Sequence, residues 1–211
     1  MKKNALAGLV GVCLCGALAV ASVPMSAAAE EVVFDNTVNE TGYYKHLSDS
    51  FLEMGDDATL AGVARQLTRV TIGFYSFSSG SFAHLSLHLY DESLVLLGDP
   101  LTLNNVVFGE NTFPTVSFAV PNYSAPDTIV WTLSYTGATF TSLPGPTVCH
   151  PPTIGTSEDT FMVDRGSGLH PEVTSGSPAN FCARIEATPE PATLSLLAVG
   201  LGAIWLRRRR Q

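Results

Sequence analysis

The histidines are the first residues to consider for chemistry, and their spacing does not form a metal centre. His84 and His88 are four residues apart within an alternating leucine pattern. A strand would place them on one face about 13 Å apart, too far for one shared metal ion. We therefore interpret both as solvent-facing strand histidines. His150 and His170 lie in a proline-rich stretch and form no ligand pattern.

Two pairs of acidic residues offer the oxygen ligands that calcium prefers: Asp56 with Asp57, and Asp91 with Glu92. Neither pair has the ligand spacing of a calcium loop, so solvated turn acids are the favoured interpretation, and calcium is the only cofactor suggested. Glycoside hydrolysis would need two carboxyl groups about 5 to 9 Å apart, a distance that the sequence does not give. No pattern supplies a nucleophile with its base or seats a catalytic metal, so we expect no enzyme.

Tyrosines are the residues best suited to contact a sugar, because the ring has an apolar face and a hydroxyl that stays hydrated. Packing in the interior or at the rim is the alternative role, and three coplanar rings on an exposed face would distinguish the two. Two functions stay open: a non-catalytic surface or matrix protein with a structural or adhesive role, and a carbohydrate-binding or glycoside-cleaving domain. The candidate rings are Tyr43, Tyr44, Tyr75, Tyr90 and Tyr123.

Segments in which every second residue is apolar predict the β-strands that must position these side chains. They occupy residues 70–74, 85–89, 116–120 and 129–135, with turn-forming residues between them. Such spacing without an amphipathic helix predicts an all-β protein, an antiparallel β-sandwich of jelly-roll-like form.

Weaker patterns predict the remaining elements of the sandwich. Further strands are predicted at 32–34, 60–63 and 181–186, with a turn at 55–57. A short helix within 47–54 is an alternative there.

The N-terminus has the three zones of a secretory signal peptide. Lys2 and Lys3 precede an apolar run over 5–23, and small residues at 26–29 follow. This order predicts a signal helix that signal peptidase removes after Ala29. The mature chain would then enter an oxidising compartment.

That compartment favours a disulfide between Cys149 and Cys182, the two cysteines of the mature chain. The loop between them is rich in glycine and proline, and the chain-entropy model gives the bond about 3.7 kcal/mol of stabilisation. Two free buried thiols are the alternative.

The C-terminus has the order of a sorting and anchoring signal. Pro189, Glu190 and Pro191 precede an apolar run over 192–206. This run would form a helix about 22 Å long, short of the roughly 30 Å hydrocarbon core. Four cationic side chains then act as a stop-transfer signal, which predicts a transmembrane helix with its C-terminus inside and the domain outside. These four are Arg207, Arg208, Arg209 and Arg210.

At residues 189–194 the chain resembles the PEP-CTERM proteins, whose signal usually opens with this same sequence. The resemblance implies an exosortase-type enzyme that recognises the tripeptide and processes the tail. It also implies export across the inner membrane, a membrane-anchored precursor, and then a place on the cell surface or outside the cell. The resemblance covers about the last 24 residues and leaves the role of the domain open.

The segments therefore divide into a signal peptide (1–29), one β-sandwich domain (30–188) and a sorting tail (189–211). Between Glu30 and Glu186 there are five basic and 18 acidic residues, a formal net charge of −13. This charge repels phosphate backbones and anionic headgroups, so we expect no nucleic-acid partner and no membrane contact except through the C-terminal helix before processing. Cations and neutral polymers, including extracellular polysaccharide, remain open as partners.

Overall fold

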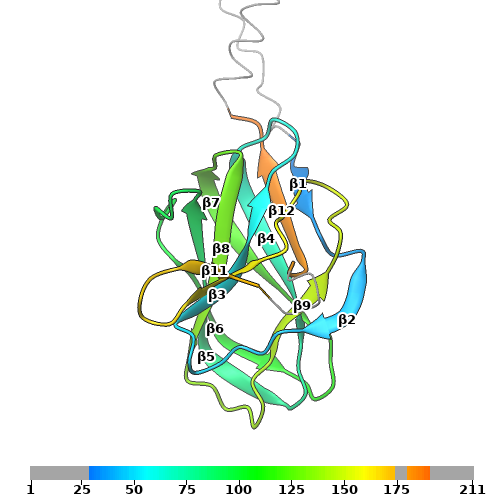
Figure 1. Ribbon diagram of the computed structural model, residues 1–211, viewed down its shortest axis with the longest axis vertical. Coiled ribbons are helices and arrows are strands. Elements are labelled where there is room, and N and C mark those ends of the chain that lie inside the picture. The colour runs from blue at the N-terminus through cyan, green and yellow to red at the C-terminus, as the bar shows by residue number, and fades with distance from the viewer. Residues whose placement is uncertain (1–28, 174–179, 191–211) are drawn as a thin grey trace, which may run out of the picture.

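Antiparallel strands make up the computed structural model, which describes residues 29–173 and 180–190 (Figure 1). The predicted all-β class is confirmed, and the strands form two sheets. The predicted signal helix and transmembrane helix lie outside the described residues. Within the described ranges, no helix is long and apolar enough to cross a membrane.

The first sheet is built around one long central strand. Its order is β1-β12-β4-β9-β2, and β7 also pairs with β4. β4 pairs with β12 over residues 66–72 and with β7 over residues 66–73, and its last two residues, Phe74 and Tyr75, pair with β9. The strands are β1 (Glu31–Asp35), β12 (Ala183–Thr188), β4 (Gln66–Tyr75), β9 (Gly145–Cys149), β2 (Glu40–Tyr44) and β7 (Thr115–Ser124).

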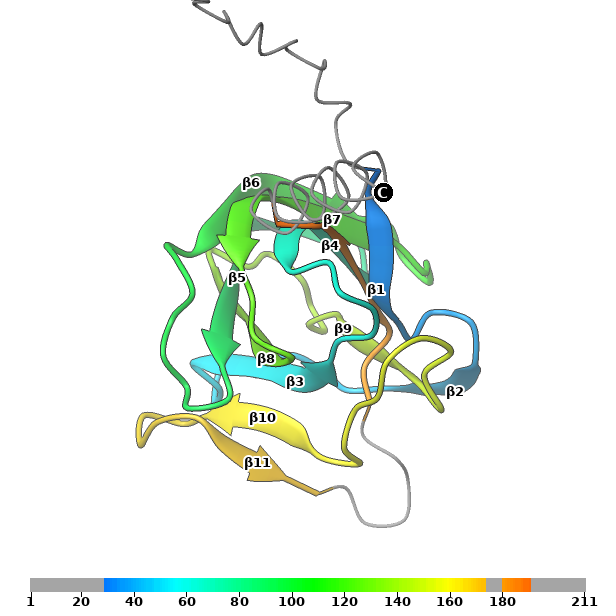
Figure 2. The ribbon, with the colours of Figure 1, turned by 90° about the horizontal axis from the view of Figure 1, so that it is seen from above.

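The second sheet packs against the first and has the order β11-β10-β3-β8-β5-β6. Figure 2 shows β10 and β11 at the edge of this sheet, beyond β3. The strands are β11 (His170–Glu172), β10 (Phe161–Asp164), β3 (Glu53–Thr59), β8 (Thr128–Thr136), β5 (Gly80–Asp91) and β6 (Leu101–Phe108).

Period-two alternation explains which faces of the strands are buried. In β4, the side chains of Val70, Ile72 and Phe74 are fully buried while their neighbours reach toward the surface. The same alternation holds in β5 and β7, as predicted. The core between the sheets includes Trp131 and a group of phenylalanines, each of which contributes about 1.5–3 kcal/mol on full burial.

The predicted turn at 55–57 is wrong, because these residues lie inside β3. Gly55 is required there, since an added Cβ would overlap the carbonyl oxygen of Trp131 on the neighbouring strand. Asp56 points inward, and its carboxylate accepts a hydrogen bond of 2.6 Å from the backbone N–H of Phe181. A buried hydrogen bond thus stabilises a polar sequence that is otherwise typical of a turn.

The strand predicted at 60–63 and the short helix considered within 47–54 are also wrong. Gly62 adopts a positive φ of 65°, which breaks the extended backbone directly after β3. Residues 47–52 form a connection with a turn, and β3 begins at Glu53.

Candidate functional site

Aromatic rings gather where the C-terminal end of β4 meets β9 and β2. Alternation in β4 turns Phe74 into the core and leaves Tyr75 on the outer face. The Tyr75 ring centroid lies 4.9 Å from that of Tyr44 on β2 and 4.8 Å from that of Phe77. Phe113, from the connection between β6 and β7, is 4.7 Å from Tyr75.

These rings line a hollow of about 240 Å³, which we call the aromatic hollow. Tyr43, Phe77 and Phe113 are 62%, 43% and 66% exposed, although aromatic side chains of this size are normally covered. A cluster of exposed apolar groups indicates an interaction site. The lining residues are Glu40, Gly42, Tyr43, Tyr44, Tyr75, Phe77, Phe113, Thr147 and Val148.

Three of the five candidate tyrosines therefore meet in one place, but their rings are not coplanar. The planes of Tyr44 and Tyr75 cross at 56°, and Phe77 meets them at 70° and 75°. The rings thus form steep walls and not a flat platform. Burial by its neighbours, and then the nearby Tyr75, raise the pKa of Tyr44.

Sequence reasoning did not single out Phe77 or Phe113. Both follow from tertiary pairing: Ser76 and Thr112 form an antiparallel bridge that brings the two connections together. The sequence around them has no periodic pattern that could have indicated this contact.

The other two candidate tyrosines pack away from the hollow. The Tyr90 hydroxyl donates a hydrogen bond of 2.7 Å to Glu53 Oε2, and burial together with this carboxylate raises the pKa of Tyr90. The Tyr123 ring lies over Gly98, and its hydroxyl donates to the Asp99 carbonyl oxygen at 3.0 Å. These two rings have the packing role that was the alternative.

The histidines have separate partners. His84 hydrogen-bonds to Asn104 at 2.7 Å, while His88 bonds to Ser134 at 2.8 Å. His150 lies 3.4 Å from Asp159, and His170 lies 3.6 Å from Glu172. In residues 29–173 and 180–190, no group of three histidine, cysteine or acidic side chains is arranged to hold a metal ion.

The four acidic calcium candidates lie in two different environments. Asp91 ends β5, and its Oδ1 accepts hydrogen bonds from the N–H groups of Ser93 and Val95, which closes a turn that includes Glu92. Asp56 is only 1% exposed. Burial, and then the charge of Asp57, raise the pKa of Asp56 well above its usual range.

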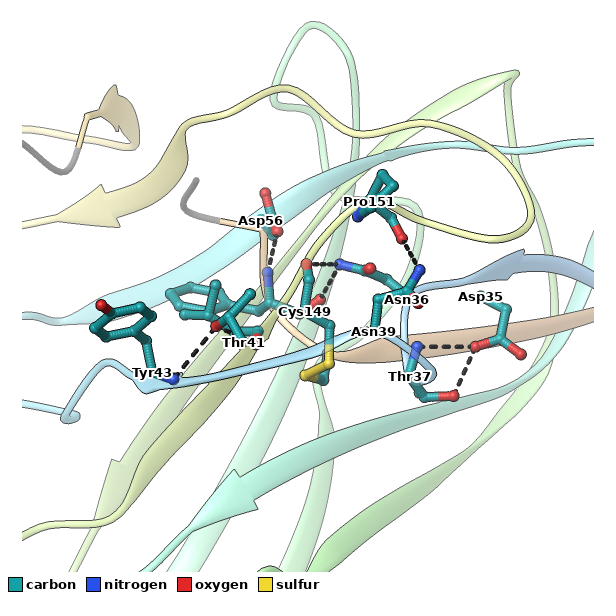
Figure 3. Close-up of a disulfide and its surroundings, with 12 residues drawn as sticks. Asp35, Asn36, Thr37, Asn39, Thr41, Tyr43, Asp56, Cys149 and Pro151 are labelled. Atoms are coloured by element: carbon teal, nitrogen blue, oxygen red, sulfur yellow. Dashed lines mark hydrogen bonds between the residues drawn. A yellow bond between two sulfur atoms is a disulfide. The ribbon is translucent and has the colours of Figure 1, made fainter. Parts of the chain in front are cut away.

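A disulfide joins Cys149 at the end of β9 to Cys182 just before β12, with a Cα–Cα distance of 4.9 Å. Backbone hydrogen bonds between β9 and residues 180–182 flank the bond. Figure 3 shows the Asn36 amide donating to the Cys149 carbonyl oxygen, at 2.7 Å. The predicted disulfide thus ties β9, which contributes Thr147 and Val148 to the hollow, to the strand that leads to the tail.

The start of the sorting motif lies at the other end of β4. β12 ends at Thr188, which pairs with Gln66. Ser124 Oγ donates a hydrogen bond of 3.0 Å to Glu190 Oε1, and Gln66 Nε2 lies 3.5 Å from the same oxygen. Pro189 is also described, whereas Pro191 and the four terminal arginines lie outside the described residues.

The aromatic hollow and the sorting motif are therefore at opposite ends of the sheet. Gln66 and Tyr75 are the first and last residues of β4. At about 3.3 Å per residue they are roughly 30 Å apart. β1 also begins at the sorting end, because Glu31 pairs with Ala187 (Figure 1).

Comparison with known proteins identifies the tail. Residues 187–210 match the PEP-CTERM protein-sorting motif. The motif implies a secreted protein with a C-terminal sorting signal, processing by an exosortase-type enzyme and a membrane-anchored precursor.

No curated protein matches the chain. Two solved structures of infectious bursal disease virus, one of the Gx strain and one of the T13 particle, are 9% and 10% identical, each with a TM-score of 0.34. They align with 81% and 80% of this chain, which spans only 45% and 41% of their length.

Proposed function

We propose that the protein is a non-catalytic adhesive component of the cell envelope or extracellular matrix, and that it binds an extracellular ligand in the aromatic hollow. One observation carries the proposal: exposed rings line a hollow roughly 30 Å from the sorting motif, at the opposite end of β4. A protein attached through its tail would present this end to its surroundings.

The chemistry of the lining supports binding without turnover. Glycoside hydrolases use two carboxyl groups, whereas Glu40 is the one acidic residue among the described residues that line the hollow. The glycoside-cleaving alternative is therefore disfavoured at this site. Carbohydrate binding, with extracellular polysaccharide as the partner, remains the second candidate, supported by the gathering of Tyr43, Tyr44 and Tyr75.

The sandwich itself supports a rigid, passive role. β1-β12-β4-β7 faces β3-β8-β5-β6, and we infer a jelly-roll topology from this division of eight strands between two sheets. Such a fold holds its connections on a fixed scaffold, and the hollow is built at the junction of β2, β4, β9 and two connections.

A binding assay that measures how much extracellular matrix material the protein captures tests the proposal. The full chain, immobilised in a polyoxyethylene detergent, is exposed to extracellular matrix fractions of the native host, and bound polymer is quantified. We expect the double variant F77A/F113A to lose most of the capture, while V107A, which removes an exposed apolar side chain on β6, retains it. Equal capture by all three proteins would refute a binding role for the hollow.

A further inference from the structure

We propose that the aromatic hollow binds an alkylated ammonium cation, such as the trimethylammonium group of a choline-type compound. The inference rests on the proposed function, which makes the hollow a ligand site, and adds the chemical class of the ligand. Ring geometry, charge and size each support it.

Ring geometry favours a rounded cation over a flat sugar. Tyr44, Tyr75 and Phe77 have pairwise centroid distances of 4.8–5.3 Å and interplanar angles of 56–75°. Rings at these distances pack edge to face against one another, so they offer the hollow separate exposed faces and edges and no flat platform on which a sugar could stack. The faces of aromatic rings carry negative charge density, which attracts a cation placed against them.

The charges in and around the hollow also favour a cation. Glu40 lies on the lining of the hollow, and no lysine or arginine is among its described lining residues. His46 is outside this lining, although its ring centroid lies 4.8 Å from that of Tyr44 and 5.9 Å from that of Phe77. The segment from residue 30 to 186 carries a formal net charge of −13. Long-range attraction and the local carboxylate both favour a cation and disfavour an anionic ligand.

The size of the hollow suits one small group. Its volume of about 240 Å³ lies below the roughly 300–1,000 Å³ of sites for drug-sized ligands. An ammonium group that carries methyl groups combines a positive charge with an apolar surface, and it is only weakly hydrated. The apolar walls would therefore favour it over a bare metal cation, which holds its water tightly.

The walls are held in place without a ligand. Thr41 Oγ1 donates to the Val148 carbonyl oxygen at 2.8 Å, which fixes β2 against β9. The Tyr75 hydroxyl donates to Asn111 Oδ1 at 3.3 Å, and the disulfide at Cys149 ties β9 to the segment before β12. Preorganised rings reduce the entropy lost on binding.

The test compares choline with 3,3-dimethylbutan-1-ol, in which a carbon atom replaces the charged nitrogen. Affinities for the full chain in polyoxyethylene detergent are measured by calorimetry. We expect choline and tetramethylammonium to bind about tenfold more tightly than the neutral analogue, because only the cations gain from the ring faces. Equal affinities for choline and the neutral analogue would overturn the proposal.

Variants identify the source of the preference. F77L and F113L keep apolar contact but remove ring faces, so each should weaken choline binding several-fold and leave the neutral analogue nearly unchanged. E40Q should weaken choline binding alone, and V107A should change neither. Circular dichroism checks that each variant is folded.

Further ligands separate the failure of this inference from the failure of the proposed function. Neutral oligosaccharides that bind in the hollow, with no binding of choline, would overturn the cation proposal and retain the ligand site. If none of these ligands binds and F77A/F113A captures matrix as the wild type does, both proposals fail. Glycerophosphocholine, which carries a lipid headgroup, and free choline distinguish a lipid source from a free amine.

Discussion

Breaking the disulfide between Cys149 and Cys182 should lower stability by a predictable amount. The bond closes a loop with a sequence separation of 33, for which the chain-entropy model gives about 3.7 kcal/mol. For a domain of this size each kcal/mol shifts the melting temperature by about 2–4 °C, so reduction should lower it by about 7–15 °C. The backbone hydrogen bonds between β9 and residues 180–182 hold the native geometry, so the loss should arise mainly in the unfolded state.

The assay is a thermal melt of the full chain, with and without a phosphine reductant, in which near-ultraviolet circular dichroism monitors unfolding. The double variant C149A/C182A is the matched control, because it should melt near the reduced wild type and should not respond to the reductant. A wild-type shift below about 2 °C, with reduction confirmed by mass analysis, would refute the entropic reasoning.

Three further predictions concern other contacts. Burial and the charge of Asp57 raise the pKa of Asp56, so the folded state binds the proton of the Asp56 carboxyl group more tightly than the unfolded state does. The free energy of unfolding should therefore fall as pH rises from about 4 through the folded pKa. The variant D57N should weaken this pH dependence in thermal melts across pH 4–8. G55A should prevent folding or greatly lower the melting temperature, because the new Cβ would overlap a carbonyl oxygen of β8; an unchanged melt would contradict this. S124A should speed processing of the tail about two- to fivefold in pulse-chase blots, because Glu190 loses its hydrogen bond of 3.0 Å, and an unchanged rate would show that this contact does not limit processing.

The local sequence pattern was sufficient to predict many of the strands of the sandwich. The alternation in β4 and β5 reports directly which side chains face the core, and it predicted both strands. The disulfide followed from cysteine number and compartment. These features depend on residues close in sequence, or on the chemistry of one residue type.

Features that depend on tertiary contacts were missed. Gly55, Asp56 and Asp57 have the composition of a turn, and only the buried contact with the Phe181 backbone explains why they form a strand. Tyr44 and Tyr75 were candidates by residue type, but Phe113 joins them through pairing between distant connections. The steep angles between the rings depend on that packing and have no signature in the sequence.

An aromatic ¹H–¹³C spectrum of the full chain, recorded with and without the captured matrix ligand, tests the role of the hollow most directly. The account predicts shifts confined to the rings that line the hollow, with Tyr90 and Tyr123 unchanged as internal controls because they pack elsewhere. Shifts at Tyr90 or Tyr123 without shifts at Tyr44, Tyr75 and Phe113 would contradict it.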